Sequence, residues 1–216
     1  MINLQQDGLT ERIQEVALFP EGEAIDLVVM NAAVNRARPF TQAQHIDLPD
    51  EAIVQTAEVN LVAPLVLATS SVRHNMALGM PPPSTIFLCS LSTWFSYPGS
   101  AFYGASKDGL VSYSKSMRRF AGGTVQIMCA FPGPLRTNMA EKSAPENTEA
   151  RIKGRMPAET AANIILAASA KGSSEVIVAG PMIQGMVKKA AWSATFAANL
   201  MRTWQFEPAL NAPKAP

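Results

Sequence analysis

The chain has 216 residues, of which 48% are hydrophobic and 16% charged, and its formal net charge is +1. This composition is that of one globular domain with a sizeable core, and it excludes the disordered and fibrous classes. The near-zero charge, without a basic stripe, argues against a nucleic-acid-binding protein. Cys89 and Cys129 both stand in apolar runs. We expect them to be reduced core thiols, and neither a disulfide framework nor a metal site.

The N-terminal segment has neither a positively charged region nor an apolar region of the secretory type, so no signal peptide is expected. No run of 18 or more apolar residues occurs, so no membrane span is expected either. The predicted compartment is the cytoplasm. His45 and His74 stand far apart, with no cysteine or carboxylate pair at ligand spacing. No metal site is therefore predicted.

The first half of the chain alternates helical and strand-like segments. Residues 9–19 carry an apolar stripe at helical spacing, and the run Ile25–Asn31 is typical of a strand buried on both faces. Residues 51–77 predict a long helix, which the prolines at 81–83 end. A second buried strand is predicted over Ile86–Cys89.

The second half continues this alternation. Prolines 132–134 predict a turn, and the polar segment 138–155 suits a lid or a surface loop. The predicted elements in order are a helix at 101–120, a strand at Val125–Phe131, a helix from Pro157 to just before Gly172, a strand at Glu175–Gly180, a terminal helix at 182–206 and a frayed end at 208–216. Residues 1–216 are expected to form a single domain, with 182–216 as its C-terminal helix and tail.

Strands that alternate with helices predict an α/β fold: a parallel sheet with helices on both faces. In such a sheet, ligands bind at the carboxyl ends of the strands. Asn31, Ser90 and the Pro132–Gly133 pair all follow predicted strands. These residues are therefore expected to line one site.

Tyr103 and Lys107 are four residues apart in a predicted helix, so they lie on the same helix face. A nearby ammonium group favours the phenolate, and it would lower the pKa of Tyr103 from its reference value of about 10. The pair would then suit acid/base catalysis of a carbonyl/alcohol interconversion. The alternative is a structural pair, with a half-buried tyrosine and a lysine that extends to solvent.

Four segments at characteristic distances resemble those of the short-chain dehydrogenase/reductase family. They are Asp26-Leu-Val-Val-Met-Asn-Ala-Ala, Asn60-Leu-Val-Ala-Pro, the set Ser90, Tyr103 and Lys107, and Pro132-Gly-Pro-Leu-Arg-Thr. The resemblance runs from about Asp26 to Thr137, and more loosely to Gly180. It implies a Rossmann-like parallel sheet and an enzyme that transfers a hydride between NAD or NADP and a ketone or secondary alcohol.

The resemblance also implies roles for individual residues. Tyr103 would be the acid/base, Lys107 would lower its pKa and bind the nicotinamide ribose, and Ser90 would hold the substrate oxygen. Asn60 would anchor a water molecule that relays protons; on the residues alone, it could instead bridge backbone in a kinked helix. Ser90 alone could be a turn residue. The implied cofactor-binding residues are Asn31, Ala32, Ala33, Lys107, Pro132, Gly133 and Thr137.

The family's Gly-rich phosphate-binding turn, which precedes these segments, has no counterpart in the 216 residues. The resemblance therefore implies that the first strands of the sheet are missing, and that the strand near Ile25–Met30 becomes an open apolar edge. The alternative function is a truncated, catalytically silent subunit in an oligomer. Family members pair through two long helices, here 51–77 and 101–120, so a homo-oligomer is expected. Membrane contact by 182–206 is not expected.

Overall fold

The structure is a computed structural model, and it describes residues 19, 21–35, 48–95, 100–121, 123–139 and 155–190. Three predicted segments lie wholly or mostly outside these ranges: the helix at 9–19, the polar segment at 138–155, and the terminal helix beyond residue 190.

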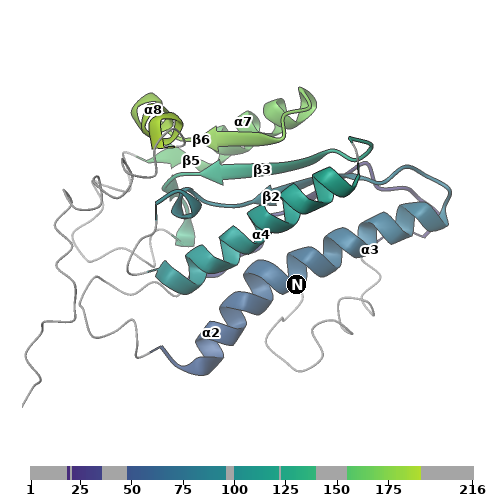
Figure 1. The fold of residues 1–216 in the computed structure, drawn as a ribbon, viewed down its shortest axis with the longest axis horizontal. Coiled ribbons are helices and arrows are strands. Elements are labelled where there is room, and N and C mark those ends of the chain that lie inside the picture. The colour runs from purple at the N-terminus through teal and green to yellow at the C-terminus, as the bar shows by residue number, and fades with distance from the viewer. Residues whose placement is uncertain are drawn as a thin grey trace, which may run out of the picture.

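Four parallel strands form the central sheet, as the sequence predicts (Figure 1). Their order is β1 (Leu27–Met30), β2 (Ser84–Leu88), β3 (Ile127–Pro132) and β6 (Glu175–Val178). β2 and β3 lie in the middle of the sheet, and their side chains are almost all buried. This placement explains why their sequences read as near-continuous apolar runs.

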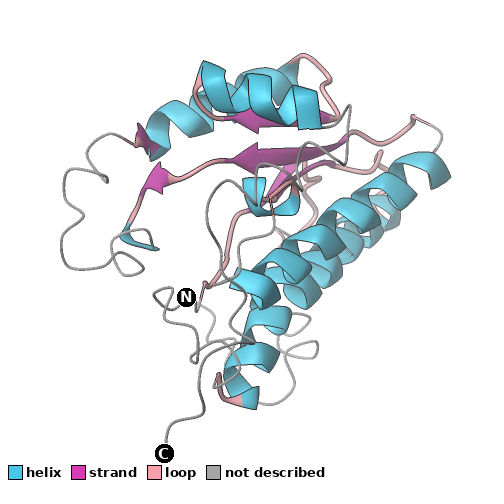
Figure 2. Ribbon diagram, turned by 60° about the vertical axis from the view of Figure 1, so that its left-hand side comes forward, coloured by secondary structure: helices cyan, strands magenta, loops and turns pink. Residues whose placement is uncertain are grey.

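Helices cover both faces of the sheet. One face carries α2 (Asp50–Ala57), α3 (Ala63–Ala77) and α4 (Ala101–Phe120), and the other carries α7 (Ala158–Ala170) (Figure 2). α8 (Pro181–Ala190) follows β6. The predicted helix at 101–120 is confirmed at both ends.

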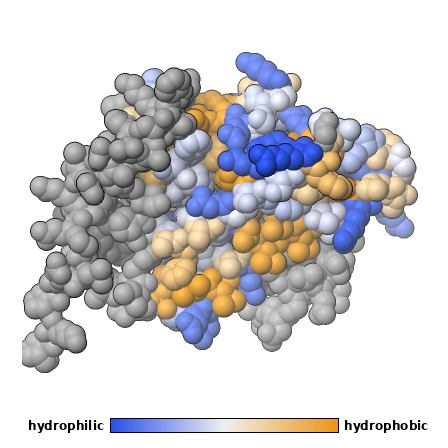
Figure 3. All heavy atoms as spheres, viewed as in Figure 1, coloured by the Kyte–Doolittle hydropathy of each residue, from blue (hydrophilic) through white to orange (hydrophobic). Residues whose placement is uncertain are grey.

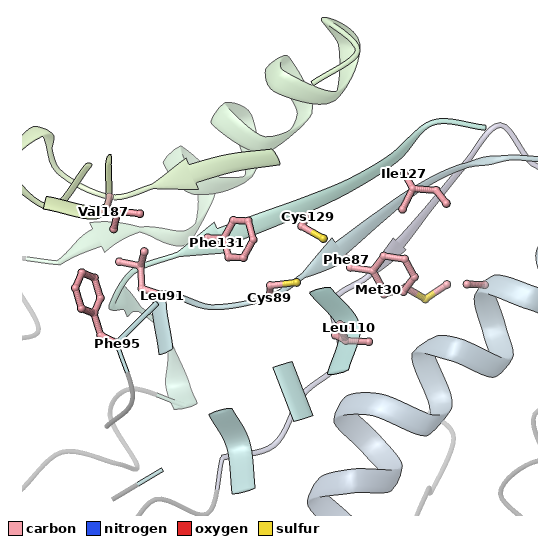
Figure 4. Close-up of a cluster of buried hydrophobic side chains, with 12 residues drawn as sticks. Met30, Phe87, Cys89, Leu91, Phe95, Leu110, Ile127, Cys129, Phe131 and Val187 are labelled. Atoms are coloured by element: carbon pink, nitrogen blue, oxygen red, sulfur yellow. The ribbon is translucent and has the colours of Figure 1, made fainter. Parts of the chain in front are cut away.

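Side chains alternate between the two faces along β2 and β3. Phe87, Cys89, Cys129 and Phe131 belong to the cluster under α3 and α4 (Figure 4). Their neighbours Ile86, Met128 and Ala130 pack against Ala161 and Ile165 of α7. Both cysteines are free and buried, as expected.

The predicted helix 51–77 is present, but a π-helical turn, Glu58–Val62, interrupts it between α2 and α3. Close packing accompanies this turn: a Cβ atom added to Gly109 of α4 would lie 2.8 Å from Cδ1 of Leu61. The π-turn therefore lies at a close approach of α4.

The helical stretch Asp50–Ala77 is long and apolar enough to cross a membrane by length and composition alone. The sequence does not predict such a span, because charged and polar residues interrupt the apolar residues of this stretch. In the structure the stretch packs on the sheet and buries polar side chains, among them Asn60 and Asn75. Asn75 hydrogen-bonds to both the backbone N–H and the C=O of Ile25, at 2.9 and 2.8 Å. It thereby fixes the start of β1.

A second sheet of two short strands is a feature that the sequence analysis misses. β4 (Leu135–Arg136) pairs in parallel with β5 (Met156–Pro157). Strands of two residues have no hydrophobic period, so no sequence pattern reveals them. Pro157 is consequently not the first residue of a helix as predicted: its extended backbone, with ψ of 145°, ends β5, and α7 begins at Ala158.

β1 lies at an edge of the sheet, and no described strand pairs with its outer side. Leu27 and Val29, on the face away from α3, are 40% and 44% exposed, whereas Met30 on the opposite face is 5% exposed. The predicted open apolar edge is therefore present in the described part of the chain.

Candidate active site

A cavity of about 580 Å³ opens at the carboxyl ends of β1, β2 and β3. Its volume is typical of small-molecule sites. It brings together nearly all the residues that the sequence analysis assigns to a site. Those in its lining are Asn31, Ala32, Ala33, Ser90, Tyr103, Lys107, Pro132, Gly133 and Thr137.

Tyr103 and Ser90 meet in this cavity. Ser90 follows β2 directly, in extended backbone, and caps the short 3₁₀ turn Leu91–Thr93, where its Oγ accepts a hydrogen bond from the N–H of Ser92 at 3.1 Å. The Ser90 side chain lies in the same cavity lining as Tyr103, and its interaction with the phenol lowers the pKa of Tyr103. Ser90 is thus both a turn residue and a partner of Tyr103, so the two alternatives for it are compatible.

The pKa of Tyr103 differs from the expectation. Burial raises the pKa of this phenol above its ordinary value, and the interaction with Ser90 lowers it by less. The expected net lowering by Lys107 is not found in this structure. The Lys107 Nζ lies 5.7 Å from the centroid of the Tyr103 ring, and it donates a 2.7 Å hydrogen bond to the main-chain oxygen of Leu88. The tyrosine is therefore protonated at neutral pH, which makes it a proton donor.

Lys107 is 1% exposed, so its ammonium group has lost most of its hydration. Burial lowers the pKa of Lys107 to about 8. Burial of a lysine ammonium without a carboxylate partner costs stability, whether or not the charge has a function. Since Lys107 also lines the cavity, it is available to a bound ligand.

Asn60 lies outside the described lining of the cavity. It is fully buried in the π-turn, and its side-chain amide pairs with the backbone of Val34: Oδ1 accepts from the N–H, and Nδ2 donates to the C=O, both at 2.8 Å. Nδ2 also lies 3.2 Å from Oγ of Ser106. Its side chain therefore bridges backbone, as in the structural alternative, and holds the segment that carries Asn31–Ala33.

The lining of the cavity fits the nicotinamide end of a dinucleotide. It includes the buried cation Lys107, the hydroxyl-bearing Tyr103 and the Pro132–Gly133 turn. A Cβ atom at position 133 would approach Cδ1 of Leu91 to 3.1 Å, so glycine allows the backbone at position 133 to pack closely against Leu91. The Gly-rich turn that would hold a pyrophosphate has no counterpart in the sequence.

The cavity lining also contains residues to which the sequence gives no catalytic or cofactor-binding role, four of which belong to the loops 91–99 and 138–155 that would set substrate specificity. They are Asn35, Leu88, Cys89, Leu91, Ser92, Ser100, Pro134, Leu135, Met139 and Arg155. Leu88 ends β2, Leu135 begins β4, and the others stand in turns, loops or short helical segments, where no residue type by itself marks a binding site. The hydrogen bond between the Cys89 and Cys129 side chains, together with burial, raises the pKa of Cys89. Cys89 therefore lines the cavity as an uncharged thiol.

The fold and this site define a nucleotide-binding type of α/β protein with a tyrosine as its candidate acid. The model of the short chain dehydrogenase family matches residues 7–148. The chain therefore belongs to this family of oxidoreductases.

Two curated relatives are reductases. Tropinone reductase-like 3 of Erythroxylum coca is 30% identical over 118 residues, which are 54% of this chain and 42% of the relative. The 3-oxoacyl-acyl-carrier-protein reductase FabG of Buchnera aphidicola is 26% identical over 144 residues, 66% of this chain and 55% of the relative. The chain thus spans about half the length of these relatives.

Solved structures confirm the fold. A short chain dehydrogenase from Burkholderia cenocepacia in complex with NADP has a TM-score of 0.69 at 21% identity, with 96% of this chain and 77% of that chain covered. One from Sphingobium yanoikuyae in complex with NADPH has a TM-score of 0.68 at 15% identity, with 99% and 76% covered. Their cofactors agree with the expected NAD or NADP.

Proposed function

We propose that this protein reduces a ketone, or oxidises the corresponding secondary alcohol, with NAD or NADP. The observation that carries this proposal is that Ser90, Tyr103 and the buried Lys107 line one cavity together. A hydroxyl pair with a buried cation beside it is the arrangement needed to polarise and protonate a carbonyl oxygen.

In reduction, Ser90 and Tyr103 both donate hydrogen bonds to the carbonyl oxygen of the substrate. The reduced cofactor supplies the hydride to the carbonyl carbon. The proton of the Tyr103 hydroxyl then passes to the developing alkoxide, which leaves a phenolate that the Lys107 ammonium stabilises. Because burial raises the pKa of Tyr103, its proton is present throughout the neutral range. Alcohol oxidation needs the phenolate, so its rate is expected to rise with pH into the alkaline range.

The cofactor would lie across the carboxyl ends of the strands. Asn31, Ala32 and Ala33 would line the ribose of its adenosine half, and Pro132, Gly133 and Thr137 would face the nicotinamide. Lys107 would exchange its bond to the Leu88 carbonyl for one to the nicotinamide ribose. Asn60 would keep the first of these segments in place. Its role as the anchor of a relay water stays a prediction, as does the cytoplasmic location.

The test is Tyr103→Phe, which removes the proton donor and keeps the ring. We expect turnover of a ketone panel to fall by roughly 10²- to 10⁴-fold, the usual contribution of a general acid. Tyr113→Phe is the matched control, because Tyr113 is on the same helix and its hydroxyl lies 3.4 Å from Thr69 Oγ1, away from the cavity. Full activity of Tyr103→Phe would contradict the mechanism.

The rival proposal is a catalytically silent subunit of an oligomer. It predicts no turnover with any carbonyl compound, together with a stable complex with a second chain. Turnover by the purified chain, abolished in Tyr103→Phe and kept in Tyr113→Phe, would exclude it.

We also propose that copies of this chain associate through the helices 51–77 and 101–120. Val54, Val62 and Met76 on the first of these helices are 53%, 38% and 65% exposed, and Phe120 at the end of the second is 87% exposed. The space-filling view shows apolar surface over the first helix (Figure 3). Exposed apolar side chains gathered on one helical face are typical of protein interfaces. Light scattering should show a dimer or larger assembly, which Val54→Asp shifts toward the monomer. A wild-type chain that stays monomeric would contradict the proposal.

A further inference from the structure

Arg155 lines the candidate active site. It directly precedes β5, and the parallel β4–β5 register places it beside Pro134, which lines the same cavity. Its side chain is half-buried. It makes no hydrogen bond or ion pair with another residue in the described part of the chain. Its guanidinium donors are therefore available to a ligand.

Arg118 shows how a structural arginine is held in this protein. Its Nη1 donates to the carbonyls of Ile127 and Ser174, at 3.1 and 3.2 Å, and its Nη2 lies 3.4 Å from a carboxylate oxygen of Glu175. That guanidinium joins the ends of strands, so its charge and its donors are used within the fold. Arg155 has no such partners among the described residues, and a role in folding does not account for it.

The charged residues in the described lining of the cavity are all of one sign. Lys107 and Arg155 are the charged residues of its described lining, and neither Asp nor Glu occurs in that lining. A smaller cavity of about 340 Å³ beside α4 differs, because Asp108 and Glu175 accompany Lys115 there. Two cations without a described counter-charge, in a partly dry cavity, favour a negatively charged ligand.

We infer that Arg155 binds an anionic group of the substrate, which makes the substrate an oxo acid or the corresponding hydroxy acid. This inference rests on the proposed function, in which Tyr103 and Ser90 hold the carbonyl oxygen. A guanidinium group matches a carboxylate in a bidentate pair, which fixes orientation as well as adding affinity. Arg155 would thereby turn the carbonyl of the substrate toward Tyr103.

A phosphate group of the cofactor is the other source of an anion in this cavity. The position of Arg155 favours the substrate. It stands beside β4, which follows the end of β3, whereas the segment proposed to line the adenosine ribose follows β1, two strands away in the sheet.

The experiment is titration calorimetry of the full chain, in the presence of NADPH, with a series of oxo acids and the methyl ester of each. Ester formation removes the charge and keeps the carbonyl. The variants are Arg155→Met, which removes the guanidinium at similar length, and Arg155→Lys, which keeps a point charge. Arg136→Met is the matched control, because Arg136 is exposed on β4 and lies outside the described lining. Melting temperatures of the variants establish that each one folds.

We expect at least one acid to bind the wild type more tightly than its ester. Arg155→Met should reduce this preference by about ten- to hundredfold, the usual effect of losing a charge-assisted hydrogen bond. Arg155→Lys should restore part of it, and Arg136→Met should leave it unchanged. Equal affinity for acid and ester, or a preference that survives Arg155→Met, would overturn the inference. So would an Arg155→Met variant that loses affinity for NADPH alone, since the anion would then be the cofactor phosphate.

Turnover of the same acid and ester pairs separates this inference from the proposed function. If the acid binds in an Arg155-dependent way and is not reduced, the reductase proposal fails and the anion site stands. If acids and esters are reduced at equal rates in both wild type and Arg155→Met, the reductase proposal stands and the anion site fails.

Discussion

The middle of the sheet and its β1 edge are built from similar apolar residues, but these side chains are buried in the middle and partly exposed at the edge. Phe87 of β2 is fully buried between two strands and the helix layer, whereas Val29 of β1 is 44% exposed. The site follows this division. Ser90, Tyr103 and Lys107 are held by the packed middle, and Asn31–Ala33 extend from the edge strand. The part of the site proposed for acid/base chemistry is thus preorganised by a complete core, and the part proposed for the adenosine half depends on fewer contacts.

The largest expected effect on stability contrasts these two regions directly. Phe87→Ala removes a side chain that packs edge-on against Tyr113 at 5.8 Å, and it leaves a cavity. We expect a loss of about 3–5 kcal/mol in the free energy of unfolding. Val29→Ala should cost less than about 1 kcal/mol, because much of its side chain is already in water. Urea denaturation measures both. Similar losses in the two variants would mean that the β1 edge is covered in solution.

Lys107 provides a second test of this difference, because its charged group is buried beside the middle of the sheet. Burial lowers its pKa to about 8 from an ordinary value of 10.5, so between these pH values the unfolded chain keeps a proton that the native chain has released. Stability contributed by this group therefore rises with pH over that window, by on the order of 3 kcal/mol.

Lys107→Met should remove this rise. Denaturation of wild type and variant at pH 7, 8, 9 and 10 tests the sign, with the exposed Lys115→Met variant as control. Parallel pH profiles for wild type and Lys107→Met would show that Lys107 is not desolvated in the native protein.

A smaller effect is expected from the two glycines of α4. Alanine at position 104 meets no atom within 4 Å, so Gly104→Ala should stabilise by about 0.5–1 kcal/mol through helix propensity. Alanine at position 109 would meet Leu61 at 2.8 Å, and overpacking of about 1–3 kcal/mol would offset that gain. Gly109→Ala should therefore melt below Gly104→Ala. The reverse order would mean that the π-turn at Leu61 yields without cost.

Much of this structure could be predicted from the sequence, because the strands of the parallel sheet are apolar runs and α4 has a clear helical period. That Ser90, Tyr103 and Lys107 line one cavity could be predicted, because their spacing resembles that of the family. The pKa of Tyr103 could not, since the burial that raises it depends on tertiary packing. The same holds for Asn60, whose amide is used by Val34, and for Arg155, which a two-residue strand brings to the cavity.

The most direct test of the central claim is a fluorescence titration of the purified chain with NADH and with NADPH. Our account predicts saturable binding of at least one of them, weakened in Lys107→Met and unchanged in Lys115→Met. A folded chain that binds neither cofactor would contradict the claim that the Tyr103 site, as built here, carries out hydride transfer.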